Sequence, residues 1–96
     1  LVDDMIDTAG TITEAIKVLT NAGAKKVIVA ATHGILSDPA VRRLSESGAT
    51  EVVITDTLPV SAEKRFPSLT ILSIAPLLAR AILEVFEDGS VTSLFT

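Results

Sequence analysis

A short segment near the start of the chain gathers most of the residues that could do chemistry. It covers residues 3–11 and reads DDMIDTAGT. Ala9 and Gly10 are small, so the backbone can come close to a ligand and successive N–H groups can form an anion-binding nest. The hydroxyls of Thr8 and Thr11 add donors, and the helix expected next adds the positive end of its dipole. This half of the segment would suit a phosphate.

The acidic half of the segment needs a different role, because carboxylates repel a phosphate. Asp3 and Asp4 come a few residues before the small residues. Their oxygens could accept hydrogen bonds from a sugar diol, or hold Mg²⁺. A molecule with a hydroxyl-bearing ring at one end and a phosphate at the other would therefore suit the whole segment. The structural alternative is a capped helix with solvated acids.

Composition bounds the fold that must position this segment. The 96 residues are 48% hydrophobic and only 3% aromatic, which predicts one small domain with an aliphatic core typical of parallel α/β sheets. The net charge is −4 and no basic run occurs, so a nucleic-acid surface is not expected. Cysteine is absent, which excludes disulfides and thiolate metal sites. The longest apolar stretch, residues 27–31, is too short to cross a membrane, and a cytoplasmic setting is the default expectation.

Strand-like and helix-like segments alternate along the chain. Residues 1–2 are interpreted as the end of a buried strand cut from something longer. Further strands are expected at residues 27–31, 51–55 and 69–73, with a short extended tail at 90–95. The stretch 27–31 is apolar without alternation, which predicts a strand buried on both faces.

Three segments have the spacing of amphipathic helices. They cover residues 11–22, 38–47 and 74–86. Thr11 or Thr13 is expected to cap the first helix, which ends at Gly23. Ser37 or Asp38 is expected to cap the second.

The order of these elements predicts an α/β fold with a mostly parallel sheet, flanking helices and right-handed crossovers. Ligands of such sheets bind beyond the carboxyl ends of the strands. Three loops are expected there, at residues 3–11, 32–38 and 56–59. The functional edge is therefore predicted at this rim.

Other polar residues near the rim are interpreted as structural. His33 is the only histidine, and without a paired carboxylate it is a weak candidate for a base; a place near substrate is the alternative. Asp56 and Thr57 favour capping and turn formation, with packing beside the substrate loops as the alternative. Lys64 and Arg65 are expected to be solvated charges.

Several motifs resemble a known enzyme family. Residues 2–12, VDDMIDTAGTI, resemble the phosphoribosyl-pyrophosphate-binding motif of proteins with the type I phosphoribosyltransferase fold. The segments ATHGILS at 31–37, VITDTLP at 53–59 and GSVTSLF at 89–95 narrow the resemblance to ribose-phosphate pyrophosphokinases. Together these motifs cover nearly the whole chain in the right order.

The resemblance implies an enzyme that transfers the pyrophosphoryl group of ATP to ribose 5-phosphate with Mg²⁺ as cofactor. It implies that Asp3 and Asp4 bind the ribose hydroxyls, partly through the metal. The residues implied to cradle the 5-phosphate are Asp7, Thr8, Ala9, Gly10 and Thr11. For Asp7, the backbone N–H is expected to face the phosphate, with the carboxylate pointing away or bonding the loop.

The end of the chain has a further implied role. In the resembled family the matching tail lines a regulatory anion site between subunits, which binds phosphate or ADP, and the enzymes commonly form hexamers from dimers. The residues concerned here are Ser90, Thr92 and Phe95. The alternative is an edge strand with polar residues facing out.

The resemblance also implies that the chain is incomplete. Residues 1–96 are expected to be the C-terminal phosphoribosyltransferase-like domain, in part, without the N-terminal domain and the catalytic loop. No catalytic residue is expected in this chain, and alone it is expected to be inactive. The alternatives are a phosphoribosyltransferase, or a non-catalytic paralogue that acts as an interaction module.

Overall fold

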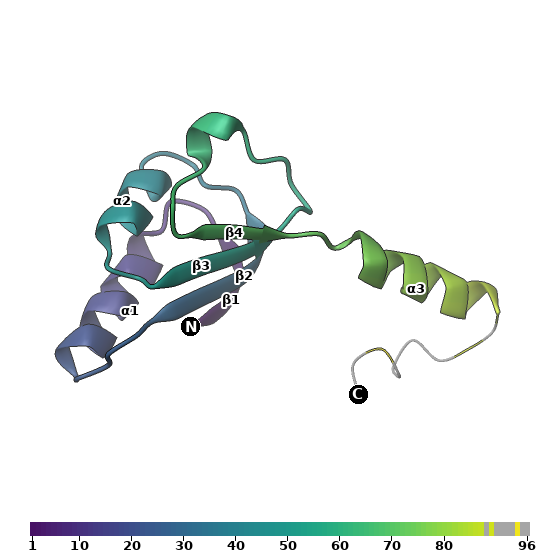
Figure 1. The fold of residues 1–96 in the computed structure, drawn as a ribbon, viewed down its shortest axis with the longest axis horizontal. Coiled ribbons are helices and arrows are strands. Elements are labelled where there is room, and N and C mark those ends of the chain that lie inside the picture. Colours follow the sequence, from purple (N-terminus) through teal and green to yellow (C-terminus); the bar gives the residue numbers. More distant parts are fainter. Residues whose placement is uncertain (88, 90–93, 95–96) are drawn as a thin grey trace.

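The computed structural model describes residues 1–87, 89 and 94. Its elements in chain order are β1 (Val2–Ile6), α1 (Gly10–Asn21), β2 (Ile28–Gly34), α2 (Ala40–Glu46), β3 (Glu51–Thr55), the 3₁₀ helix η1 (Ala62–Lys64), β4 (Leu69–Leu72) and α3 (Ala75–Phe86) (Figure 1). The extended tail expected at 90–95, with Ser90, Thr92 and Phe95, lies outside the described residues apart from position 94.

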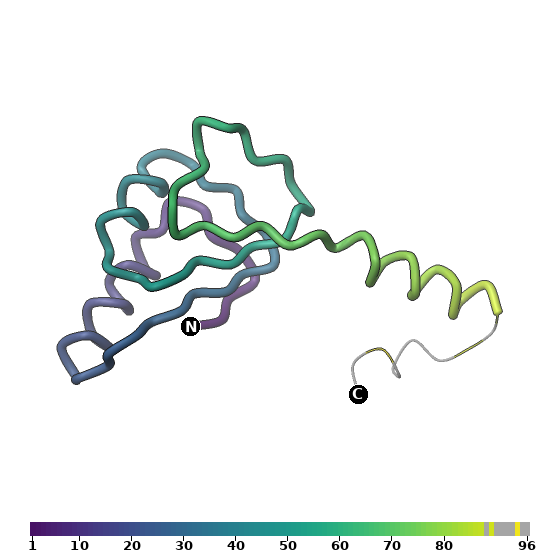
Figure 2. Tube along the Cα trace, viewed as in Figure 1, coloured from purple at the N-terminus to yellow at the C-terminus, as the bar shows by residue number. Residues whose placement is uncertain are grey.

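The four strands form one parallel sheet in the order β1-β2-β3-β4. Right-handed crossovers between strands in consecutive order place every connection on the same face. In agreement, α1 and α2 lie side by side against the sheet (Figures 1 and 2). Ile16 of α1 and Leu44 of α2 share one buried cluster with Val29 and Ile54 of the sheet. The predicted α/β class with a parallel sheet is confirmed.

The opposite face of the sheet is uncovered by the described residues. Along β2, Val29 and Ala31 are buried, whereas Ile28 and Thr32 are exposed. The prediction that residues 27–31 are buried on both faces is therefore wrong for this structure. The reason is topological, because both helices that pack on the sheet come from crossovers on one side.

The first strand is longer than its sequence indicates. Parallel pairing runs from Val2 opposite Ala30 to Ile6 opposite Gly34. Asp3 and Asp4 therefore both belong to β1. The expectation that the strand ends at Val2 and that a loop covers 3–11 is wrong. Acidic residues fit here because β1 is the first strand of the order and their side chains stay exposed.

The end of α1 follows the predicted pattern. Gly23 has φ +104°, its N–H donates to the Thr20 carbonyl at 3.1 Å, and the Ala24 N–H donates to the Leu19 carbonyl at 3.0 Å. This pair of bonds is the Schellman motif, which needs a left-handed residue. The helix end expected at Gly23 is confirmed.

The predicted helix caps are wrong, although both helices begin within two residues of the expected positions. The residue before α1 is Ala9 and the residue before α2 is Pro39, and neither helix has a side-chain cap. Thr13 instead turns its hydroxyl back toward the Ala9 carbonyl. The caps expected from Thr11 or Thr13, and from Ser37 or Asp38, are therefore absent from this structure.

The connection from β3 to β4 contributes to the core without an α-helix. Phe66, which follows η1, is 8% exposed and belongs to the buried cluster. Only the solvated charges of Lys64 and Arg65 were expected in this connection, because Phe66 has no apolar residue directly beside it other than Pro67. Arg65 is exposed as expected, while Lys64 is half-buried.

Helix α3 stands away from the sheet (Figures 1 and 2). None of its residues is buried, and Leu78, Ile82 and Phe86 are 53%, 69% and 85% exposed. Its apolar face is thus unpartnered among the described residues. No helix in the described part of the chain is long and apolar enough to cross a membrane.

Gly34 offers a test of how tightly the rim of the sheet is packed. A Cβ at Gly34 would overlap Cδ1 of Ile54 and lie 3.2 Å from its Cγ2. Gly34→Ala should therefore lower the free energy of unfolding by about 1–3 kcal/mol, the usual cost of overpacking. Adding Ile54→Val removes Cδ1, so the double variant should be more stable than the sum of the single changes indicates. The free energy of unfolding is measured in urea for the unchanged protein, Gly34→Ala, Ile54→Val and the double variant. If the two single effects simply add in the double variant, the packing argument is wrong.

Candidate functional site

The connection between β1 and α1 is short and anchored at both ends. It consists of residues 7–9. Ile6 before it and Ile12 after it belong to the buried cluster. The Ile6 carbonyl also accepts hydrogen bonds from the N–H groups of Ile35 and Leu36, at 2.9 and 3.1 Å. The loop is therefore held at the carboxyl edge of the sheet by the core and by the loop after β2.

Ala9 gives this loop an unusual backbone. Its φ and ψ are 65° and 14°, in the left-handed region, and α1 follows at once. A left-handed residue beside a right-handed one turns successive N–H groups toward a common point, which is the geometry of an anion-binding nest. Such a conformation costs about 1–3 kcal/mol in a residue other than glycine. The Thr13 hydroxyl lies 2.7 Å from the Ala9 carbonyl and 3.0 Å from the Gly10 carbonyl, and it helps to hold this conformation.

Gly10 lies beside α2, which the sequence did not indicate. A Cβ at Gly10 would lie 3.2 Å from Nη1 of Arg43 on α2, and the guanidinium would have to shift by a few tenths of an ångström to accommodate it. We expected the glycine to let a ligand approach the backbone, but in this structure its side-chain direction faces α2.

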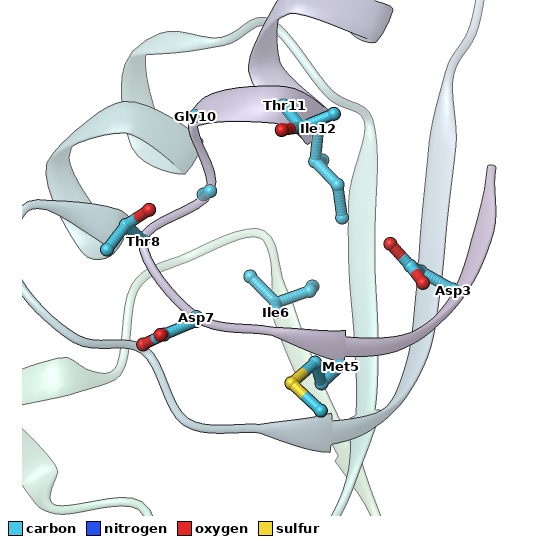
Figure 3. Close-up of a pocket in the computed structure, with 9 residues that line it drawn as sticks. Asp3, Met5, Ile6, Asp7, Thr8, Gly10, Thr11 and Ile12 are labelled. Atoms are coloured by element: carbon cyan, nitrogen blue, oxygen red, sulfur yellow. The ribbon is translucent and has the colours of Figure 1, made fainter.

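A hollow lies inside the loop (Figure 3). It is lined by residues 3 and 5–12. The structure thus brings together six of the seven predicted site residues, namely Asp3, Asp7, Thr8, Ala9, Gly10 and Thr11. In Figure 3 the Asp3 carboxylate is directed toward the hollow, and the Asp7 carboxylate is directed away from it. That orientation of Asp7 agrees with the expectation from the sequence.

Asp4 is the predicted site residue that does not line this hollow. Asp3 pairs with Ala31, which is buried, and its carboxylate is directed toward the hollow. The two carboxylates are neighbours in sequence, but only Asp3 lines the hollow.

Asp3 and Asp4 are the residues expected to hold a magnesium ion. Both side chains are exposed oxygen donors, the kind that Mg²⁺ prefers. Residues 1–87, with 89 and 94, contain no group of three or more acidic, histidine or cysteine side chains that could hold a metal. Asp3 and Asp4 therefore fit an ion that takes most of its ligands from a bound substrate and water, as Mg²⁺ commonly does.

The remaining rim residues bond to one another. Nδ1 of His33 lies 2.7 Å from the Thr57 hydroxyl, and the Thr55 hydroxyl donates to the Thr32 carbonyl at 2.6 Å. The Asp56 carboxylate accepts the Ile74 N–H at 2.8 Å, next to the start of α3. These contacts join the ends of β2, β3 and β4, and they support the structural interpretation of His33, Asp56 and Thr57.

Arg43 is the residue near the site that sequence reasoning missed. Its Nη1 donates to the Thr8 carbonyl at 3.1 Å, across 35 positions of sequence. No local pattern indicates such a contact, because Arg43 lies in a short helix with ordinary spacing. Its relation to the loop is visible only once α1 and α2 are packed side by side.

Comparisons with known proteins agree with the motifs. The chain is 64% identical over 95 residues to the protein named ribose-phosphate pyrophosphokinase from Mycobacterium tuberculosis, covering 99% of this chain and 29% of that protein. It is 67% identical over 95 residues to the protein of the same name from Bifidobacterium longum, covering 99% of this chain and 28% of that one. The chain thus spans less than a third of the curated relatives it matches.

A solved structure shows the same arrangement. The crystal structure of phosphoribosylpyrophosphate synthetase from Mycobacterium smegmatis superposes with a TM-score of 0.86 at 64% identity. The match covers 93% of this chain and 30% of that chain. The family described as "Phosphoribosyl synthetase-associated domain" matches residues 1–96. The chain therefore belongs to the phosphoribosyl synthetase-associated domain family.

Proposed function

We propose that this chain is the ribose 5-phosphate-binding part of a ribose-phosphate pyrophosphokinase. The observation that carries the proposal is the loop at residues 7–11, where left-handed Ala9 and the first turn of α1 border a hollow that also receives Asp3. The similarity to named pyrophosphokinases over nearly the whole chain supports the same reaction. The full enzyme transfers the pyrophosphoryl group of ATP to the anomeric hydroxyl of ribose 5-phosphate.

The loop would bind the 5-phosphate through its backbone. The first N–H groups of α1 have no partner within the helix and carry its positive dipole end. Gly10 and Thr11 supply these N–H groups, and the hydroxyls of Thr8 and Thr11 can donate further bonds. Asp7 would contribute its backbone N–H, because its carboxylate is directed away from the hollow. This arrangement binds and orients one end of the sugar phosphate.

The acids would bind the other end of the substrate. Asp3 faces the hollow and can accept hydrogen bonds from the ribose hydroxyls. The role of Asp4 is supported by the family motif alone. Together they would hold Mg²⁺ against the substrate. The ion would supply charge neutralisation for the phosphates during transfer.

The transfer step would need residues from elsewhere in the enzyme. Phosphoryl transfer relies on positioned cations, and none of the residues lining the hollow is basic. We therefore assign no catalytic residue to this chain. Its proposed place is the C-terminal, incomplete phosphoribosyltransferase-like domain of a cytoplasmic enzyme. The uncovered sheet face and the exposed apolar residues of α3 support further structure packing on both.

Assembly and regulation belong to the same proposal. The full enzyme would form homo-oligomers, as hexamers built from dimers. Ser90, Thr92 and Phe95 would line a regulatory anion site between subunits. The SVTSLF motif in the sequence supports this role for the three residues.

A second candidate is a non-catalytic interaction module of the same family. The exposed apolar face of α3 is the observation that favours it, since such a face fits a protein partner. The complete phosphate loop favours the enzyme instead, because a module without substrate would have no need of the left-handed Ala9.

The role of Asp3 can be tested in the full-length enzyme. Asp3→Asn should raise the KM for ribose 5-phosphate about tenfold or more, since hydrogen bonds to charged groups contribute about 1.5–3 kcal/mol. Steady-state kinetics with each substrate varied in turn measures this. Glu14→Gln is the matched control, because Glu14 is exposed, pairs with Lys17 and lies outside the hollow. Equal KM values in both variants would refute the assignment of the hollow.

The division of labour between this segment and the rest of the enzyme is also testable. Residues 1–96 alone should produce no phosphoribosyl pyrophosphate from ATP and ribose 5-phosphate, because the hollow has no basic lining residue to stabilise the transferred group. A coupled assay for the product measures this, with the full-length enzyme as positive control. Product formed by the isolated segment would show that it contains a transfer centre.

A further inference from the structure

Arg43 of α2 contacts the loop of residues 7–9, which is proposed to bind the phosphate. Nη1 of Arg43 donates to the Thr8 carbonyl at 3.1 Å and lies close to the backbone of Gly10. Its neighbour Arg42 has a different partner, the Glu46 carboxylate at 3.4 Å. In the described part of the chain Arg43 has no carboxylate within ion-pair distance. The contact of the guanidinium is therefore its hydrogen bond to the loop backbone, and no ion pair among the described residues competes with it.

The contact determines which way a peptide group of the loop faces. In a trans peptide the C=O and the following N–H point in opposite directions. The Thr8 carbonyl points to Arg43, so the Ala9 N–H points away from α2. Ala9 lines the hollow and Arg43 does not, so an N–H that points away from Arg43 can face the hollow.

The next peptide group is oriented in the same way by α1. The Ala9 carbonyl accepts bonds from the N–H and the hydroxyl of Thr13, at 3.0 and 2.7 Å. The Gly10 N–H therefore points opposite to the body of α1. Two consecutive N–H groups thus point away from the two helices, because Arg43 and Thr13 bond the two carbonyls that precede them. Of the two contacts that hold these carbonyls, only the one from Arg43 comes from a distant part of the sequence.

We propose that Arg43 is a positioning residue for phosphate binding, which holds the Thr8–Ala9 peptide so that the Ala9 N–H faces the anion. This inference rests on the proposed function, since it assumes that the hollow binds the 5-phosphate. Arg43 acts through the backbone and is not itself placed in the hollow.

The test uses three variants of the full-length enzyme and one control. Arg43→Met removes the donor and keeps an unbranched side chain. It should raise the KM for ribose 5-phosphate roughly three- to tenfold, the usual effect of one hydrogen bond. The KM for ATP and kcat should change by less than about twofold. Arg42→Met is the matched control, and it should leave all constants unchanged because Arg42 contacts Glu46 rather than the loop.

Two further variants separate the hydrogen bond from the charge. Arg43→Gln keeps a donor without the charge, and Arg43→Lys keeps the charge without the planar guanidinium. If Arg43 positions the peptide, Arg43→Gln should restore part of the affinity lost in Arg43→Met. If Arg43→Gln equals Arg43→Met although it keeps a donor, the charge and not the hydrogen bond carries the effect and the positioning role is wrong; Arg43→Lys, which keeps both the charge and a donor, should then match the unchanged enzyme. Equal increases in the KM for ATP would likewise indicate a general structural defect.

The outcome for Asp3→Asn separates this inference from the proposed function. A raised KM for ribose 5-phosphate in Asp3→Asn with an unchanged KM in Arg43→Met would overturn only the role of Arg43. Unchanged constants in both variants would overturn the assignment of the hollow itself. A raised KM in both, with Arg42→Met unaffected, is the result we expect.

Discussion

The site depends on the packing of two helices against one face of a parallel sheet. Ile16 of α1 and Leu44 of α2 meet Val29 and Ile54 in a single buried cluster. This cluster aligns the carboxyl ends of β1, β2 and β3 at one edge. It also brings α2 within reach of the loop before α1. Without it, the backbone of that loop would lose its restraint from outside and would relax to the commoner conformations of a short polar turn.

The same topology leaves a large part of the molecule uncovered. Because the crossovers that carry α1 and α2 lie on one side, the other face of the sheet exposes Ile28 and Thr32, and α3 presents Leu78 and Ile82 to solvent. The match to the Mycobacterium smegmatis structure covers 93% of this chain but only 30% of that chain, so the matched protein is much longer. An apolar helix face held away from its own sheet fits contact with the rest of such a protein.

Local patterns predicted the elements better than the site. The end of α1 at Gly23 could be predicted because the Schellman motif involves only neighbouring residues. The length of β1 could not, because its acidic residues become strand only through pairing with β2. The left-handed Ala9 was missed for a similar reason. Alanine seldom adopts that conformation, and the contacts that hold it come from Thr13 and Arg43.

The strain at Ala9 links formation of the site to formation of the fold. A left-handed alanine is less stable than a right-handed one by about 1–3 kcal/mol, so the loop adopts it only when several contacts act together. Thr13 can act as soon as α1 forms, because it lies four residues away. Arg43 can act only after α2 has packed beside α1, since its contact spans 35 positions. The two restraints on the proposed anion-binding backbone are therefore complete only in the fully packed domain. An anion bound there would stabilise the same arrangement in return, because it would pair with N–H groups that the strained backbone leaves without partners.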